Sequence, residues 1–458
     1  MSSSEDAGAG LRADLVALLT ERGSVSDPGV AAALGQVPRH VFVPAAELAE
    51  AYADQAVVTH HRDGVPTSSA SQPAMVAAML EQLRPPPRGS ILEIGAGTGY
   101  NAAVLSELVG ASGRVVTVDI DPEVADEARA HLSQAGVANV AVICGDGALG
   151  WADGAPYDGI IVTAGVADLA PAWVAQLRPG GRLVVPLSIR GVSQSVALTG
   201  AGGGHLRSVA VCEAMFMPLT GAMANADRHW PVPGRPGVRV QAAAGPPVDT
   251  GLIETALDGP GFAVALGVTA SSREVFGGLR RWLAFAEPDA ALLSYAGSGP
   301  DADASGVPAV FELTRRGLAG RASPCILGPA GFAALDLAGP AVAAEGPVRH
   351  RTLELAVREY GQARRQAARL ADLVTTWDAA GRPGIDRLHI DAYPSGTSPS
   401  AASTTPQPAA HTTPHPAIHT TLHPATHTTL HPATHATLHR ATHTTFAVRF
   451  RPAPAGQS

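Results

Sequence analysis

Residues 90–101 read S-I-L-E-I-G-A-G-T-G-Y-N and join an apolar run to three closely spaced glycines. The run Ile91–Ile94 has the pattern of a strand that is buried on both faces. Apolar residues at helical spacing follow over 102–108 and predict a helix. Strand, glycine turn and helix in this order bring the backbone close to a nucleotide-like ligand at the carboxyl end of a sheet, because glycine has no Cβ to block the turn or the ligand.

The spacing of the glycines distinguishes a dinucleotide site from a site for another nucleotide-like ligand. A dinucleotide site requires G-x-G-x-x-G, whereas here Gly95, Gly97 and Gly99 are evenly spaced and Tyr100 stands where that pattern has its third glycine. Glu93 lies two residues before the first glycine. The pattern E-x-G-x-G-x-G resembles motif I of the S-adenosylmethionine-dependent methyltransferases, and the resemblance implies that the acid and the turn hold the amino-acid end of that cofactor. The alternative is a glycine-rich turn that binds no ligand.

The next two apolar strands also end in acidic residues. Residues 114–120 end in Asp119, which lies where a carboxylate can accept hydrogen bonds from both ribose hydroxyls of a nucleotide. Asp121 starts the helix predicted at 123–135 and is interpreted as its N-cap. The strand that begins at Val140 ends in G-D-G at 145–147, a sequence that is also common in simple turns.

Strands and helices continue to alternate after this point. Further strands are predicted at 157–163, 178–186, 195–199 and 206–217, with a helix at 173–177. This alternation from 88 to 217 predicts the α/β class, with a Rossmann-like, doubly wound sheet.

The segment before the glycine turn narrows the resemblance. Residues 37–44 read V-P-R-H-V-F-V-P, residues 51–55 read A-Y-A-D-Q, and residues 71–73 read S-Q-P. They resemble the VPR-x-x-F-VP, AY-x-D and T-I-S-Q-P-x-x-V motifs of the protein-L-isoaspartate O-methyltransferase family. Residues 216–220, F-M-P-L-T, resemble its x-V-P-L-T motif. Over about residues 31–220 the chain is identified as a member of that family.

The resemblance implies a set of site residues and a cofactor. Ser71 would align the substrate carboxylate with the methyl group of S-adenosylmethionine and is the predicted catalytic residue, with Ser69 and Gln72 as its neighbours in the substrate site. The predicted cofactor-binding residues are Glu93, Gly95, Gly97, Gly99, Asp119, Asp146, Gly147 and Thr220, with Asp146 at the adenine end.

Ser71 has a second interpretation from its position. It lies just ahead of the helix predicted at 75–83, whose free amide donors would favour an anionic carboxylate. A serine at this place can also simply cap the helix.

The predicted reaction is methylation of a carboxylate, which is already a nucleophile at pH 7, so the enzyme must mainly orient it and exclude water. Attack by the next backbone amide nitrogen would then turn the ester into a succinimide. The substrate is predicted to be a protein or peptide that carries isoaspartate, as in repair, or one ordinary aspartate of a dedicated ribosomally made peptide. A small-molecule methyltransferase and a non-catalytic peptide-binding protein are the alternatives.

Composition excludes several other classes. The formal charge of −8 gives no basic surface for nucleic acid. No run of about 18 apolar residues predicts a membrane span, and the N-terminus lacks the pattern of a signal peptide, so a cytoplasmic location is expected. Cys144, Cys212 and Cys325 have no metal or disulfide spacing. No metal site is predicted, and the oligomeric state stays open.

The chain is much longer than this core, at 458 residues. A Pro/Gly/Ala-rich linker is predicted at 223–248 and an accessory α+β domain at 249–394, with a helix over 352–377. This extension resembles that of actinobacterial family members found with lanthipeptide and related ribosomal-peptide pathways. The predicted segments are 1–87 (N-terminal), 88–222 (cofactor-binding core), 223–248, 249–394, 395–444 and 445–458.

The last segments contain a histidine repeat. Histidine recurs at every fourth residue from His411 to His443, nine times, and prolines interrupt the repeat. Disorder is predicted in preference to a metal-binding helix. Because residues 388–392 and 445–450 both alternate like strands, we expect them to pair, with the repeat as a loop between them.

Overall fold

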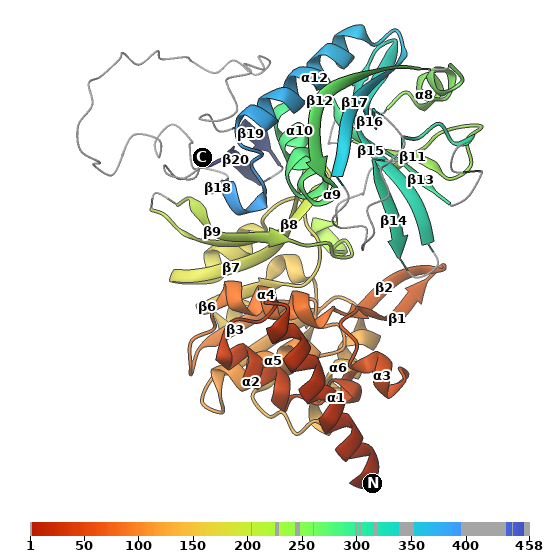
Figure 1. Cartoon of the computed structure of the whole chain (residues 1–458). Helices are drawn as coiled ribbons and strands as arrows, with labels where there is room; N and C mark the ends of the chain where they lie inside the picture. The colour runs from red at the N-terminus through yellow and green to blue at the C-terminus, as the bar shows by residue number, and fades with distance from the viewer. Residues whose placement is uncertain are drawn as a thin grey trace.

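The computed structural model contains two large β-sheets that lie one above the other (Figure 1). It describes residues 2–452 apart from residues 203, 225–228, 243–247, 260, 298–300, 302–303, 309, 316–317, 339–351, 395–436 and 442. In this described part, no helix is both long and apolar enough to cross a membrane.

The first sheet has ten strands, of which five are parallel and five antiparallel. The parallel strands β7, β6, β3, β4 and β5 lie side by side in that order, and the antiparallel strands continue from β7 as β8, β9, β18, β20 and β19. Their bounds are β3 (Ser90–Ile94), β4 (Arg114–Asp119), β5 (Val140–Cys144), β6 (Tyr157–Val162), β7 (Leu177–Ile189), β8 (Val192–Gly200), β9 (Leu206–Glu213), β18 (Leu388–Pro394), β19 (Thr437–Arg440) and β20 (Thr444–Phe450).

The order of the parallel strands creates a switch point. The chain starts in the middle with β3, runs outward to β4 and β5, and then returns to the other side of β3 with β6 and β7. Connections therefore leave β3 and β6 in opposite directions, which opens a crevice at their carboxyl ends. The predicted doubly wound α/β sheet is confirmed.

Helices cover one face of the parallel strands. Apolar residues of the N-terminal helices form a core with Ile91, Val115, Ile161 and Val184 of the sheet. The helices are α1 (Ser2–Glu21), α2 (Pro28–Gln36), α3 (Leu48–Ala51), α4 (Pro73–Leu83), α5 (Tyr100–Val109), α6 (Pro122–Gln134) and, on the opposite face, α7 (Pro171–Gln176).

The V-P-R motif has a structural reason. Arg39 is fully buried, donates a hydrogen bond from Nε to the Ala51 carbonyl at 2.8 Å, and lies 4.8 Å from the ring centre of Tyr100 at the start of α5. This buried contact between cation and ring fixes the N-terminal segment against the helix that follows the glycine turn.

The second sheet is antiparallel throughout and carries its own helices. Its strands follow the order β10-β11-β13-β15-β16-β17-β12, with β14 paired to β15. The bounds are β10 (His229–Pro231), β11 (Val238–Ala242), β12 (Phe262–Ser271), β13 (Ala290–Ala296), β14 (Phe311–Arg315), β15 (Leu318–Gly328), β16 (Gly331–Leu337) and β17 (Thr352–Gly361), with helices α8 (Thr250–Leu257), α9 (Ser272–Glu274), α10 (Arg280–Ala286) and α12 (Arg364–Ala379).

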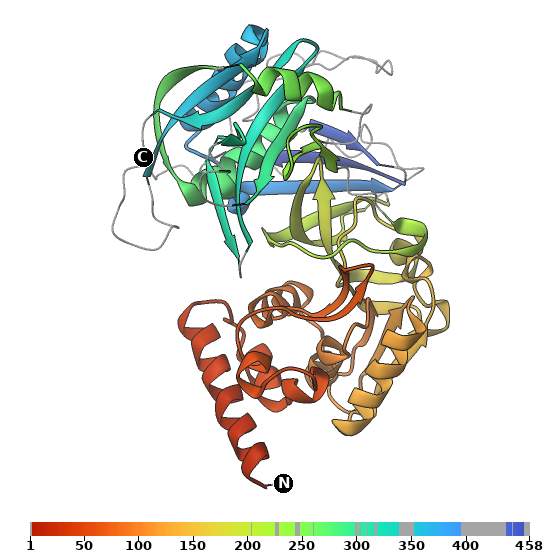
Figure 2. The same cartoon turned by 90° about the vertical axis from the view of Figure 1, so that its right-hand side faces the viewer.

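The two sheets share one core. A continuous apolar cluster contains Trp173 of α7 together with Trp282 of α10 and Trp377 of α12. Helix α10 contacts β8 of the first sheet and β13 of the second, and α12 packs on α10 and on the second sheet, whose position above the first can be followed in Figures 1 and 2. Burial of these large side chains holds the C-terminal extension on the first sheet.

The predicted boundaries around the extension need correction. Residues 223–248 were predicted as a linker, but they contain β10 and β11, which are strands of the second sheet. Pro233, Gly234, Pro236 and Gly237 lie in two tight turns between β10 and β11, and Val238 and Val240 of β11 are buried. The predicted accessory segment also ends too late, because β18 lies in the first sheet.

The helix predicted over 352–377 is wrong in its first half. Residues 352–361 form β17, where Leu353, Leu355 and Val357 are buried at a period of two. Gly361 ends this strand with φ +68°, and the helix starts only at Arg364. The apolar residues of this segment fit both the helical period of about 3.6 and the strand period of 2. Pairing with β12 and β16 makes the segment a strand.

The two C-terminal strands pair as predicted. β18 and β20 are antiparallel over their whole lengths, and Asp391 between them accepts from Arg207 Nε and pairs with Arg449, each at 2.9 Å. Residues 437–440, predicted as disordered, form β19 instead. Most of the histidine repeat lies outside the described residues, so its predicted disorder is untested.

Candidate active site

The glycine turn lies at the switch point and depends on glycine for two separate reasons. Gly95 has φ +94°, and a Cβ there would lie 2.5 Å from Thr163 Oγ1 at the end of β6. Gly97 has φ +50° and approaches the Ser69 carbonyl, which would lie 3.4 Å from an added Cβ. The turn is therefore both left-handed and tightly enclosed, and it leaves its backbone facing a cavity.

Gly99 has a different role from the one predicted. It precedes α5 with φ +85°, and a Cβ would lie 3.3 Å from the Ala128 carbonyl and from Leu132 of α6. It is not among the residues that line the cavity. Glycine is needed at position 99 because α5 packs closely on α6. Direct contact of Gly99 with a cofactor is not supported.

Asp119 is where the sequence predicts it, at the carboxyl end of β4. Its Oδ2 accepts from the Gly97 backbone N–H at 3.1 Å, and its Oδ1 accepts from the Asp121 N–H at 3.1 Å. Burial raises the pKa of the Asp119 carboxyl, while these backbone donors act in the opposite direction. Asp121 caps α6 as predicted, accepting from the Glu123 N–H.

Glu93 is held under the turn by two donors. Its carboxylate accepts from Thr117 Oγ1 at 2.6 Å and from Asn101 Nδ2 at 2.7 Å, and the side chain is fully buried. Burial raises the pKa of Glu93 to about 7. Neither Asn101 nor Thr117 is predicted from the sequence as a site residue, although Asn101 is the last residue of the stretch 90–101.

This pKa predicts a pH-dependent stability. The cofactor-free folded protein binds a proton at Glu93 more tightly than the unfolded chain, whose glutamate pKa is about 4.5. The resulting stabilisation is complete below about pH 4.5 and is lost as pH rises through about 7. Glu93→Gln lacks this loss, so its stability relative to wild type should increase between pH 5 and 8, by up to about 3 kcal/mol. Denaturant unfolding at several pH values measures the difference.

Glu107→Gln, on the exposed side of α5, is the control and should show a constant difference from wild type. A constant difference for Glu93→Gln as well would contradict the raised pKa.

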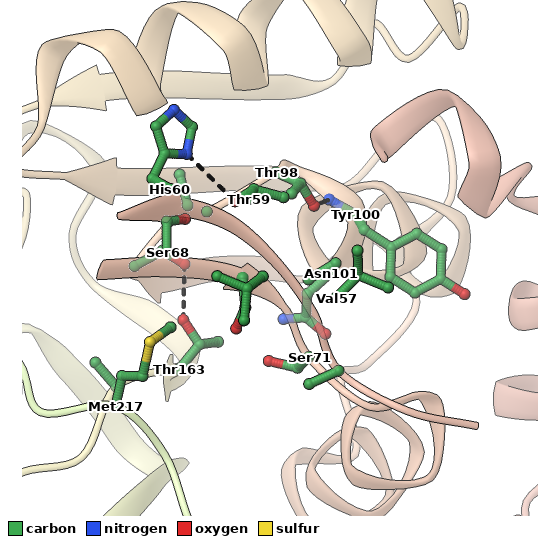
Figure 3. Close-up of a pocket in the computed structure, with 18 of the residues that line it drawn as sticks. Val57, Thr59, His60, Ser68, Ser71, Thr98, Tyr100, Asn101, Thr163 and Met217 are labelled. Atoms are coloured by element: carbon green, nitrogen blue, oxygen red, sulfur yellow. Dashed lines mark hydrogen bonds between the residues drawn. The ribbon is translucent and has the colours of Figure 1, made fainter. Parts of the chain in front are cut away.

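Ser71 lies at the cavity with a free hydroxyl. Within the described part of the chain it makes no hydrogen bond, and the N-cap position of α4 belongs to Gln72, which makes no capping bond. Interpretation of Ser71 as a helix cap is therefore wrong. Ser68, Ser71, Asn101 and Thr163 lie around the same cavity (Figure 3).

The amide donors of α4, in contrast, are already used. Asp54 Oδ1 accepts from the Ala74 N–H at 3.0 Å, and Gln72 donates from Nε2 to Asp54 Oδ2 at 3.1 Å. The prediction that this helix N-terminus attracts a substrate carboxylate is corrected, because an aspartate of the chain itself occupies it. Gln72 lines the cavity but is tied to Asp54.

A hairpin that the sequence analysis missed forms another wall. Strands β1 (Val57–Arg62) and β2 (Val65–Ala70) pair around Asp63-Gly64, both of which have positive φ. An Asp-Gly pair between extended residues is a strong signal for such a turn and could have revealed it. Thr59, His60 and Ser69 of this hairpin line the cavity.

Of the remaining predicted site residues, some lie at the cavity and one does not. Gly147 and Thr220 line the cavity, as does Ser69. Asp146 does not: its carboxylate accepts from the backbone N–H groups of Ala148 and Ala222, each at 2.9 Å. A contact of Asp146 with adenine stays a prediction.

The cavity has a volume of about 1160 Å³ and runs from the glycine turn to the hairpin. Its lining contains Glu50, Glu93, Asp119 and Glu127, whereas no lysine or arginine occurs among the described residues that line it. Such a site favours a cationic ligand. An anionic ligand would be oriented by uncharged hydrogen-bond donors of the lining. Gly95 and Gly97 allow the protein backbone to approach a bound nucleoside closely, and the Asp119 carboxylate can accept hydrogen bonds from the ribose hydroxyls.

A parallel sheet with its cavity at this switch point, a glycine turn on one side and an acid after the next strand is the architecture of the class I methyltransferases, whose methyl donor is S-adenosylmethionine. The model of the family described as protein-L-isoaspartate(D-aspartate) O-methyltransferase matches residues 11–224. The chain belongs to this protein-L-isoaspartate O-methyltransferase family and is a methyltransferase of its type.

Individual relatives support this assignment. A protein-L-isoaspartate O-methyltransferase of Methanopyrus kandleri is 40% identical over 211 residues, which are 46% of this chain and 91% of the relative. One of Roseiflexus castenholzii is 41% identical over 225 residues, 48% of this chain and 96% of the relative. The second sheet therefore lies beyond the region shared with these relatives.

Solved structures of similar proteins were also found. One protein-L-isoaspartate O-methyltransferase is 23% identical with a TM-score of 0.46, covering 83% of this chain and 96% of that one. A putative family member of Plasmodium falciparum in complex with S-adenosyl-L-homocysteine is 18% identical with a TM-score of 0.41, covering 46% of this chain and 98% of that one. The family assignment rests on the sequence relatives.

Proposed function

We propose that the chain methylates a side-chain carboxylate of an isoaspartyl or aspartyl residue in a protein or peptide. The observation that carries the proposal is the free Ser71 hydroxyl in the S-Q-P segment, at a cavity that also contains the glycine turn and Asp119. S-adenosylmethionine, when bound, supplies an electrophilic methyl group.

The residues of the chain have two tasks in this proposal. Asp119 and the backbone of Gly95 and Gly97 bind the nucleoside part of the cofactor. The Ser71 hydroxyl donates to one carboxylate oxygen of the substrate and orients the other toward the reacting methyl. No general base is needed, because a carboxylate with a pKa near 4 is ionised at pH 7.

The electrostatics of the cavity agree with this division of work. An arginine or lysine beside the substrate would stabilise the carboxylate before the reaction and so reduce its reactivity. Because the described lining has neither, neutral hydroxyls hold the carboxylate and leave it nucleophilic. In the ring closure to a succinimide, the next amide nitrogen of the substrate then attacks the ester carbonyl and displaces the methoxy group, which leaves as methanol with the amide proton.

A second candidate substrate is one ordinary aspartate of a dedicated ribosomally made peptide, as in the lanthipeptide-associated members that the extension resembles. The favouring observation is the second sheet, which adds surface beyond the length shared with the relatives. A non-catalytic peptide-binding protein is not favoured, because Glu93, Asp119 and the glycine turn are all in place.

Methyl transfer from labelled S-adenosylmethionine to two peptides, identical except for isoAsp or Asp, tests the proposal. We expect the isoAsp peptide to be methylated and the Asp peptide to remain unlabelled. Cofactor binding without methylation of either peptide would favour the dedicated-peptide candidate. Absence of cofactor binding would refute the function altogether.

In the same assay, Ser71→Ala should lower the rate constant about 10- to 100-fold, the range expected for one hydrogen bond to a charged group. Affinity for S-adenosylhomocysteine should stay within about twofold of wild type, because Ser71 is assigned to the substrate. Ser69→Ala, from the same wall, is the comparison and should lose less. An unchanged rate for Ser71→Ala would remove its assigned role.

A further inference from the structure

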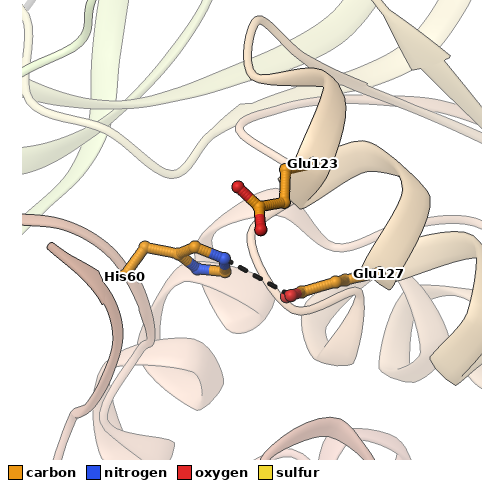
Figure 4. A group of neighbouring side chains, drawn as sticks. All are labelled: His60, Glu123 and Glu127. Carbon is orange, nitrogen blue, oxygen red and sulfur yellow. Dashed lines mark ion pairs between the residues drawn. The ribbon is translucent and has the colours of Figure 1, made fainter. Parts of the chain in front are cut away.

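Three side chains with metal-ligating atoms meet at the rim of the cavity. His60 comes from β1 of the hairpin, and Glu123 and Glu127 come from α6 (Figure 4). Their ligand atoms all lie within 4.8 Å of one another, and His60 Nε2 is 3.4 Å from Glu127 Oε1. No metal site is predicted from the sequence, because His60 and Glu123 are 63 residues apart and only the fold brings them together.

The two glutamates have an unbalanced charge. They are four residues apart on one face of α6, where like charges repel. Neighbouring acids have arginine partners: Asp121 pairs with Arg62 at 3.0 Å, and Asp126 pairs with Arg129. Among the described residues, neither Glu123 nor Glu127 pairs with an arginine, and the ion pair that Glu127 makes is with His60.

The imidazole of His60 is oriented for ligation. Its Nδ1 lies 3.2 Å from Thr59 Oγ1, a contact that suits an N–H on Nδ1 and leaves the Nε2 lone pair facing Glu127. A hydrogen bond to the second ring nitrogen is a usual support of metal-binding histidines.

We propose that His60, Glu123 and Glu127 form a binding site for a divalent first-row metal ion. One imidazole and two carboxylates are a mixed nitrogen and oxygen ligand set of the kind that Zn²⁺ and Mn²⁺ accept, with water completing the coordination. Metal–ligand distances of about 2.0–2.2 Å require the three groups to move closer. Glu123 is exposed and the Glu127 side chain is 45% exposed, so both side chains can rotate to do this.

The ion would act as a clamp on the cavity. His60 and Glu127 both line the cavity, one on the hairpin and the other on α6. A metal bound between them adds to the Arg62–Asp121 ion pair, which already joins hairpin and helix. The hairpin is then held closed, and exchange of the ligand in the cavity becomes slower. This consequence rests on the proposed cofactor site, whereas the metal site itself does not.

Titration with Mn²⁺, followed by loss of the free Mn²⁺ signal in electron paramagnetic resonance, tests the site in the full chain without cofactor. Mn²⁺ is chosen because it prefers oxygen ligands, and the histidine repeat at 411–443 contains no acidic residue. We expect one equivalent bound to wild type and about tenfold or weaker binding in His60→Asn and Glu127→Gln.

His61→Asn, the exposed neighbour on the same strand, is the matched control and should bind like wild type. Both glutamates are on the surface, so Glu127→Gln should fold normally even if His60→Asn does not. Equal Mn²⁺ binding by wild type, His60→Asn and Glu127→Gln would overturn the site.

The clamp has a separate readout. Dissociation of labelled S-adenosylhomocysteine should be slowed severalfold by Mn²⁺ in wild type and in His61→Asn, but not in Glu127→Gln. A rate that Mn²⁺ leaves unchanged in wild type would overturn the clamp. Because the titration contains no cofactor, failure of the methyltransferase proposal would not affect its result.

Discussion

Gly95→Ala is expected to destabilise the fold by about 3–4 kcal/mol and to remove measurable cofactor binding. The backbone at Gly95 has φ +94°, which costs an L-residue about 1–2 kcal/mol. The added Cβ would also lie 2.5 Å from Thr163 Oγ1. Thr163 cannot simply turn away, because its hydroxyl donates to the carbonyls of Ile94 and Gly95. Denaturant unfolding and calorimetric titration with S-adenosylhomocysteine measure the two losses.

Two further variants separate the causes. Gly136→Ala has φ +72° with no atom within 4 Å of the added Cβ, so it should show the conformational cost alone. Thr163→Ala combined with Gly95→Ala removes the contacted oxygen and should recover the part due to the clash. Equal destabilisation by Gly95→Ala and Gly136→Ala would show that enclosure of the turn has no energetic role.

Asp119→Ala is expected to weaken S-adenosylhomocysteine binding by about 100- to 10,000-fold. Two hydrogen bonds to a charged carboxylate contribute about 1.5–3 kcal/mol each, so loss of both accounts for this range. Asp119→Asn keeps one acceptor oxygen and should be intermediate. Calorimetric titration gives the affinities, and unfolding of each variant checks that loss of the bonds to Gly97 and Asp121 has not disrupted the turn.

Asp126→Asn is the matched control on the adjacent helix. Asp126 is exposed and pairs with Arg129 at the surface, so its affinity should equal that of wild type. Wild-type affinity in Asp119→Ala would show that the carboxylate does not bind the cofactor.

The parallel half of the first sheet could be predicted almost completely from local patterns. Strands β3, β4 and β6 are buried on both faces and read as apolar runs, as in 91–94 and 157–162, whereas β5 at the edge is partly exposed. Caps such as Asp121 then mark where the helices begin. These features depend on residues close together in sequence, so they can be recognised without the fold.

Prediction failed where one pattern fits two structures. Residues 352–361 suit a helix or a strand, and only two neighbouring strands made them β17. The Pro/Gly-rich residues 229–242 looked like a linker because their pairing partner, β13, lies about 50 residues further along the chain. The hairpin at 57–70 is different, since its Asp-Gly turn was visible and overlooked.

For the site, the sequence by itself determined the residues that a backbone turn and a strand end require: Gly95, Gly97 and Asp119. Their roles follow from steric and hydrogen-bonding needs that act within a few residues. Tertiary structure alone decided that Asp54 occupies the N-terminus of α4, that Gly99 packs on α6, and that His60 meets Glu127. Each of these depends on a contact between distant segments, and the distance between such segments is set by packing of the whole core rather than by local sequence.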